Sequence, residues 1–149
     1  MGQILKPIAI GGALCAVLDF TAATVLYAFR GVKPLRLWQS VASGMLGPSS
    51  YQHGWASGAL GLLVHVLVAF TASAVFFVVS SQLPALRRHY LVAGVLYGVA
   101  IYLFMNLVVI PLSAIPRRNA PIEMVIAQVL IHIILIGPSI SFSVSRFSR

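Results

Sequence analysis

Residues 54–80 read GWASGALGLLVHVLVAFTASAVFFVVS and contain no Lys, Arg, Asp or Glu. A helix that crosses the hydrocarbon core of a membrane needs about 20 mainly apolar residues. This stretch therefore predicts a membrane-spanning helix. One side chain departs from the pattern, because His65 lies in the middle of an otherwise apolar run.

The rest of the chain extends this pattern to three more predicted spans, at residues 7–29, 90–115 and 122–142. The composition agrees, with 60% hydrophobic and 8% charged residues and a mean hydropathy of +0.99. Soluble domains carry about a quarter charged residues. The second and third links are short, so consecutive spans should run antiparallel. We expect a single all-α domain over residues 1–149, an integral membrane four-helix bundle.

The link between the first two spans predicts a short amphipathic helix over residues 34–46. Pro34 suits a helix start, and Gly47 with Pro48 suits its end. One predicted face holds Leu35, Trp38, Ala42 and Met45, and the other holds Arg36, Gln39, Ser40 and Ser43. Such a helix should lie in the membrane interface, marked by Arg36 and Trp38. Trp38, Tyr51 and Trp55 would then form an aromatic belt, although an ordinary surface loop is the alternative.

The net charge of +8 comes from ten Lys and Arg residues spread in small groups between the apolar runs. This distribution is typical of charges that flank membrane helices and face lipid headgroups. We therefore expect membrane lipids as partners and no nucleic acid. The basic residues divide five against five between the two sides, which leaves the topology open. The same even split leaves a homodimer open, including an antiparallel one.

Polar side chains occur at one depth in all four predicted spans. Asp19, His65, Asn106 and His132 each lie about ten residues from the side that carries residues 34–46, or about 15 Å at the helical rise. This depth is near the midplane of the membrane. The four residues predict a polar midplane layer, with Gln128 nearby.

The small residues around His65 predict which way it faces. Gly58, Gly61, His65 and Ala69 share one helical stripe, and small residues allow close helix approach. His65 should therefore face protein. Asp19 has no Lys or Arg at its depth, and a lone carboxylate in a span is costly. We predict that Asp19 lies within hydrogen-bonding reach of His65 or His132, directly or through one water.

Several roles for the layer are open at this point. It is either a satisfied structural network or a site that handles protons or a small solute. A third reading is bis-histidine ligation of haem b by His65 and His132, with room left by Gly58 and Gly61. A metal site is disfavoured, because two histidines and one aspartate make a thin donor set. Asn106 serves either as helix–helix glue or as a residue that orients the network.

Glu123 is read as structural, because it lies in the first turn of the fourth span near the membrane edge. There its carboxylate complements the helix dipole and can meet Arg117 or Arg118.

No serine-hydrolase, phosphate-binding, CxxC or HExxH motif is present, so we expect no enzyme. The leading functional hypothesis is transport or sensing of protons or a small solute. The alternatives are a haem-binding electron carrier and a structural or assembly subunit of a membrane complex.

The segments LDFTAATVLYAFRGVKPLRLWQSVASGMLG, LGLLVH, YLFMNLVVIPLSA and IHIILIGPSI together make up 59 of the 149 residues. In these segments it resembles a family of small bacterial inner-membrane proteins and, more broadly, the YagU-like proteins, a group linked to acid tolerance. The resemblance implies a bacterial source, a multi-pass protein of the inner membrane and four helices. It implies no catalytic residues.

Overall fold

The computed structural model describes residues 2–115 and 120–148, and in these residues every regular element is helical. Four helices among them are long and apolar enough to cross a membrane: Ile4–Ala28, Gly54–Gln82, Tyr90–Leu112 and Ile122–Phe147. The chain is therefore a multi-pass membrane protein, and the predicted all-α four-helix bundle is confirmed. The last helix continues to Phe147, beyond the predicted end at residue 142.

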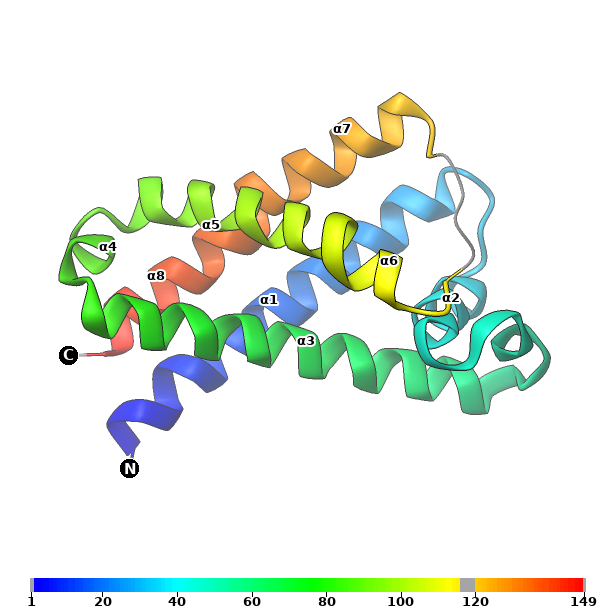
Figure 1. Cartoon of the computed structure of the whole chain (residues 1–149), viewed down its shortest axis with the longest axis horizontal. Coiled ribbons are helices and arrows are strands. Elements are labelled where there is room, and N and C mark those ends of the chain that lie inside the picture. The colour runs from blue at the N-terminus through cyan, green and yellow to red at the C-terminus, as the bar shows by residue number, and fades with distance from the viewer. Residues whose placement is uncertain (1, 116–119, 149) are drawn as a thin grey trace.

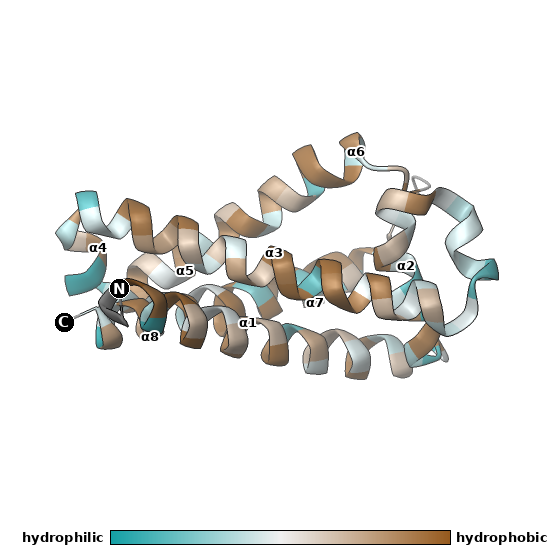
Figure 2. Ribbon diagram, turned by 90° about the horizontal axis from the view of Figure 1, so that it is seen from below, coloured by the Kyte–Doolittle hydropathy of each residue, from teal (hydrophilic) through white to brown (hydrophobic). Residues whose placement is uncertain are grey.

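Each span is built from one or more consecutive elements. The elements in chain order are α1 (Gly2–Ala28), α2 (Pro34–Leu46), η1 (Gly47–Gln52), α3 (Gly54–Gln82), α4 (Pro84–Arg88), α5 (Tyr90–Phe104), η2 (Met105–Val109), α6 (Ile110–Leu112), α7 (Ile122–Ile131), η3 (His132–Ile136) and α8 (Gly137–Phe147). Both chain ends and α4 lie at one end of the bundle, and α2 lies at the other (Figure 1). Apolar residues cover most of the long helices, and polar residues gather at the two ends (Figure 2).

The half of the bundle near the chain ends is closely packed. Helix α1 packs against α3 and α8, and α5 packs against α8. The buried cluster there is Cys15, Ala16, Ala69, Phe76, Ala93, Ile136, Ile140 and Val144. Tyr97 of α5 adds a link to α3, because its hydroxyl donates to the carbonyl of Ala72 at 2.7 Å and its ring lies 5.0 Å from that of Phe76. This half is therefore closed between α3 and α5.

Helices α5 and α8 cross at glycines, where a side chain would not fit. A Cβ on Gly137 would meet the carbonyl oxygen of Gly94, and a Cβ on Gly98 would meet the carbonyl oxygen of His132. The crossing therefore requires backbone-to-backbone approach, as small-residue spacing predicts for membrane helices.

The third and fourth spans each contain a π-helical turn before a proline. A proline has no N–H to donate and crowds the carbonyl four residues earlier. In η2 the N–H of Ile110 donates to Met105, five residues back, and Pro111 follows. In η3 the N–H of Gly137 donates to His132 in the same way, and Pro138 follows. These widened turns lie where the third and fourth spans carry their predicted layer residues.

Helix α2 forms over the predicted residues 34–46, but the prediction of its exposed face was partly wrong. Gln39 and Ser43, assigned to the polar outer face, are buried. The amide of Gln39 donates to the carbonyl of Gly54 at 3.0 Å. The glycine stripe of α3 explains this burial, because Gly58 meets the side chain of Leu35 and Gly61 meets the backbone of α2. Helix α2 therefore packs along the start of α3.

The prediction that Trp38 belongs to an aromatic belt was wrong, because its side chain is only 8% exposed. Its ring stacks on that of Phe20, with the ring centres 4.3 Å apart. Trp55 is exposed, as a belt residue would be. Arg36 is also exposed, and its guanidinium lies 4.1 Å from the ring centre of Tyr51. Trp38 therefore joins α2 to the bundle, and Arg36 remains at the surface.

Candidate functional site

A cavity of about 410 Å³ occupies the half of the bundle that carries α2. Its wall includes every member of the predicted polar layer: Asp19 from α1, His65 from α3, Asn106 from η2, Gln128 from α7 and His132 from η3. Helix α2 closes one side through residues 40–45, and it is joined to the chain after α6 by a hydrogen bond from the Ala114 N–H to the Gly44 carbonyl at 3.0 Å. The four spans and α2 thus line one chamber.

His65 is held in a fixed orientation by two neighbours. Its Nε2 lies 3.1 Å from the carbonyl oxygen of Ala16 on α1, and its ring meets that of Trp38 edge-on, with 5.6 Å between ring centres. A carbonyl oxygen only accepts hydrogen bonds, so Nε2 must carry a hydrogen. The polar residue in the apolar run of α3 therefore binds the neighbouring helix, and its second nitrogen is left for another partner.

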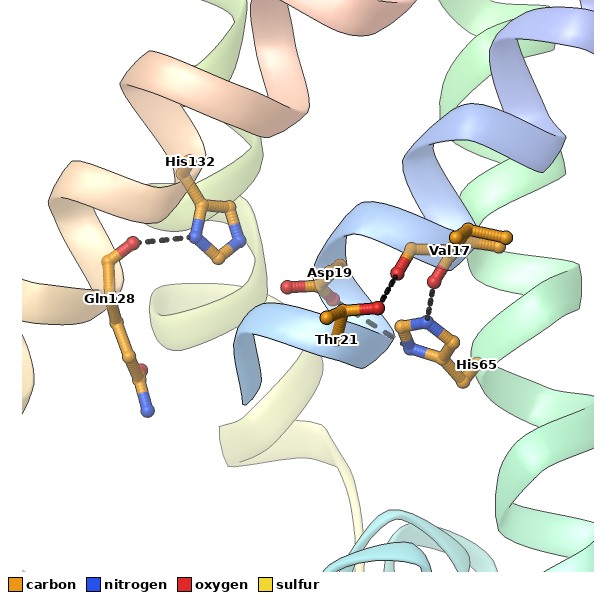
Figure 3. A network of polar contacts seen from close by, with 7 residues as sticks. Val17, Asp19, Thr21, His65, Gln128 and His132 are labelled. Atoms are coloured by element: carbon orange, nitrogen blue, oxygen red, sulfur yellow. Dashed lines mark hydrogen bonds and ion pairs between the residues drawn. The ribbon is translucent and has the colours of Figure 1, made fainter. Parts of the chain in front are cut away.

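That partner is Asp19, whose Oδ2 lies 3.7 Å from Nδ1 of His65 (Figure 3). This separation is short enough for an ion pair when His65 is protonated, but it is longer than a hydrogen bond. With Nε2 already protonated, a bare Nδ1 would face a carboxylate, and two acceptors repel each other. One proton on either atom removes the conflict, giving an imidazolium with a carboxylate or a neutral imidazole with a carboxylic acid. The pair can therefore hold one proton between Nδ1 and the carboxylate.

The Asp19 carboxylate has little support from the rest of the protein. Its side chain is 30% exposed, against 13% for that of His65. Among residues 2–115 and 120–148, no N–H or O–H group donates a hydrogen bond to it, and the cavity wall includes no Lys, Arg or Glu. A charged group in an apolar setting needs such support or a ligand. Asp19 is thus available to a guest in the cavity.

His132 approaches from the opposite wall, so that Asp19 lies between the two histidines in Figure 3. Its Nδ1–H donates to the carbonyl of Gln128 at 2.8 Å, and its ring lies edge-on to Tyr102. Nε2 is therefore the nitrogen free to accept a proton. In the described part of the chain no hydrogen bond or ion pair joins His132 to Asp19. Direct contact occurs only for Asp19 with His65.

The two amides of the layer have different roles. The Asn106 amide donates to the carbonyl of Tyr102 on its own helix at 2.9 Å. In the described residues this is the hydrogen bond that the Asn106 side chain makes, so its role as helix–helix glue stays a prediction. The Gln128 amide donates to the hydroxyl of Tyr27 at 3.0 Å and so ties α7 to α1. Tyr27 keeps its own hydroxyl proton for another acceptor.

Tyr27 and the α2 residues Ser40 and Met45 line the cavity but were missed in the sequence. A signal for Tyr27 was present, because Asp19, Ala23 and Tyr27 follow one another at four-residue spacing on α1. No comparable signal pointed to Ser40 or Met45. Their position depends on how α2 folds back onto α3.

The cavity does not fit a haem held between two histidines. Both nitrogens of His65 are engaged, one by Ala16 and the other beside Asp19. Gly58 and Gly61, expected to leave room for a porphyrin, are covered by Leu35 and Trp38 of α2. The described residues also contain no group of three His, Cys, Asp or Glu side chains that could hold a metal ion.

Glu123 lies outside the cavity, and 69% of its side chain is exposed. It faces Arg30 across 3.9 Å, which joins the end of α1 to the start of α7. Exposed pairs of this kind contribute about 0–1 kcal/mol. Arg117 and Arg118, its expected partners, lie outside the described residues.

Comparison of this chain with family models, curated proteins and solved structures gives no match. The resemblance to small bacterial inner-membrane and YagU-like proteins stays a prediction from sequence. What is established is a multi-pass four-helix membrane protein in which Asp19 and His65 lie 3.7 Å apart in a chamber beside α2.

Proposed function

We propose that the protein transports or senses protons or a small solute through this cavity, with Asp19 and His65 as the group that gains and loses a proton. In the proposal the protein resides in the inner membrane of a bacterium, as the sequence resemblance implies. His132 is the second proton acceptor across the chamber, and Asn106 and Gln128 line the path between them.

The observation that carries the proposal is the hydrogen bond from His65 to Ala16. It commits Nε2 as a donor, and in the proposal the other nitrogen and the carboxylate share a single proton. A carboxylate with a purely structural role in a span is expected to accept hydrogen bonds from neighbouring helices. Asp19 receives none from the described residues, which favours a group that changes its protonation state.

Proton flux in liposomes tests the proposal. Purified protein is reconstituted with a pH-sensitive dye inside the vesicles, and a pH step is applied outside with the membrane potential clamped. We expect a dye response faster than that of protein-free vesicles. The Asp19→Asn variant should lose this response, because an amide cannot take up the proton that a carboxylate shares with imidazole.

Glu123→Gln is the matched control, because Asp19 and Glu123 are the two acidic residues of the chain. Each substitution removes one negative charge and keeps the side-chain shape, yet only Asp19 lines the cavity. Glu123→Gln should retain the wild-type rate. Equal rates for Asp19→Asn and wild type would overturn the proposal.

A further inference from the structure

We propose that the solute of this cavity is a small lipophilic organic cation, which binds at the Asp19 carboxylate and displaces the proton held there. This inference rests on the proposed function and names the substrate class of the same site. It follows from the size of the cavity, the apolar character of its wall and the charge of the one acidic group on it.

The cavity is far larger than a proton path requires. Its volume of about 410 Å³ falls within the 300–1,000 Å³ that is usual for sites binding drug-sized molecules. Most of the wall is apolar, including Val64, Val68, Ile101, Ile110, Ile131 and Ile136. Such walls favour an organic molecule over a hydrated inorganic ion, which needs oxygen ligands on several sides.

The cavity also has an apolar rim. Met45 and Val68 line it and are 66% and 39% exposed, so the chamber is not sealed on the side where α2 and α3 meet it. On the opposite side Tyr97 bridges α5 to α3. A lipophilic molecule can therefore reach the polar pair along apolar side chains without crossing the packed core.

The charge on the wall selects a cation. Once the shared proton has left, Asp19 is ionised, the histidines are neutral and the described wall has a formal charge of −1, because it carries no Lys or Arg. The remaining titratable groups that face the pair are Cys15 and Tyr27 from α1 and His132 from η3, whereas α2, α5, η2 and α6 present none. An anion would meet the carboxylate and no opposite charge, so its binding is unfavourable.

Cation binding and proton binding compete at this pair. In the empty state one proton is shared between Asp19 and His65. A cation beside the carboxylate repels the positive imidazolium, and the proton leaves for solvent. The balance is one proton released for each monovalent cation bound, with no change in net charge. Cation affinity should therefore rise with pH, by about tenfold per pH unit where the empty pair is protonated.

Benzyltrimethylammonium is a suitable probe, because its charge is permanent and it has no proton of its own to release. Binding to the full-length protein in detergent is measured by isothermal titration calorimetry at several pH values. Proton release is measured with an indicator dye in weakly buffered solution. We expect saturable binding that strengthens with pH and release of about one proton per bound cation.

Neopentylbenzene, which has the same shape without the charge, is the matched ligand control. It should bind more weakly and release no proton. Asp19→Asn should abolish proton release and weaken cation binding by about tenfold or more, whereas Glu123→Gln should change neither. The pH series and the neutral ligand test the wild-type protein, so the result does not depend on whether a variant folds.

The outcomes separate this inference from the proposed function. Proton flux that depends on Asp19, together with no cation binding or with equal binding of the neutral ligand, would overturn the inference and leave the proposed function intact. Cation binding without proton release would overturn the claim that the cation displaces a proton from the pair of Asp19 and His65. Absence of both flux and cation binding would remove both proposals.

Discussion

Asp19 and His65 show how one backbone contact sets the chemistry of a side chain. The carbonyl of Ala16 selects the nitrogen of His65 that carries hydrogen. The other nitrogen then depends on Asp19 for its proton. The aspartate alone would be an unfavourable charge in a membrane span. In the proposed function the two residues form one unit that gains and loses a proton.

The tautomer of His65 can be measured directly. Two-dimensional 1H–15N NMR of the histidine rings across a pH series should show Nε2 of His65 protonated at every pH, with only Nδ1 changing state. His53 is exposed and should exchange between both neutral tautomers. The His65→Gln variant identifies the His65 signals by their loss. A neutral form of His65 protonated at Nδ1 would contradict the assigned hydrogen bond.

The elements of the bundle are held together by glycines, and the prolines shape the cavity wall. Each π-helical turn precedes a proline, and His132 begins η3 while Asn106 lies within η2. Without these prolines an ordinary α-helix would continue and would turn the following residues to another face. The glycines have the complementary role, because they bring α8 against α5 and α2 against α3.

Stability at the α5–α8 crossing should depend on Gly137. Gly137→Ala places a methyl group against the backbone of Gly94 and Gly98. We expect a loss of about 1–3 kcal/mol in the free energy of unfolding, as for other overpacked sites. Gly44→Ala is the control, because the nearest atom to its Cβ is 3.7 Å away. The stabilities of the two variants are compared by thermal unfolding in detergent, with circular dichroism as the readout. A Gly137→Ala variant as stable as Gly44→Ala would contradict the close backbone approach of α5 and α8 at Gly137.

At the scale of the whole molecule, the two halves of the bundle differ. The half near the chain ends is filled by apolar side chains, and three of them, Cys15, Ala69 and Ile136, also line the cavity in the half near α2. A second cavity of about 390 Å³ adjoins it, lined by Arg36, Pro48 and Tyr51. Tyr27 and Ser40 line both cavities. A water-soluble molecule should therefore enter from the α2 side.

Cysteine labelling tests the direction of access. With Cys15, the single cysteine, replaced by Ser, new cysteines are treated with a membrane-impermeant maleimide in right-side-out and inverted vesicles. Ser40→Cys should react from the same side as Lys33→Cys, which reports the exposed loop before α2. Ser141→Cys should not react, since Ser141 is fully buried. Reaction of Ser40→Cys only from the side of Arg88→Cys, at the opposite end, would exclude this route.

The sequence alone determined the class of the protein, because apolar runs of this length have one favourable environment and each forms a helix independently of the others. It also pointed to residues of the candidate site, since an ionisable group such as Asp19 or His65 is costly in a span wherever the helices lie. The bounds of α2 followed from local signals at Pro34 and Gly47 in the same way.

Only the tertiary structure decided which of these residues meet. Helix rotation and crossing place His65 against Ala16 and Asp19 but leave His132 across the chamber. The burial of Trp38, Gln39 and Ser43 likewise depends on the glycine stripe of α3, which lies outside the sequence of α2 itself. Periodicity describes one helix at a time, whereas a cavity is formed by the side chains of several helices that approach one another in space.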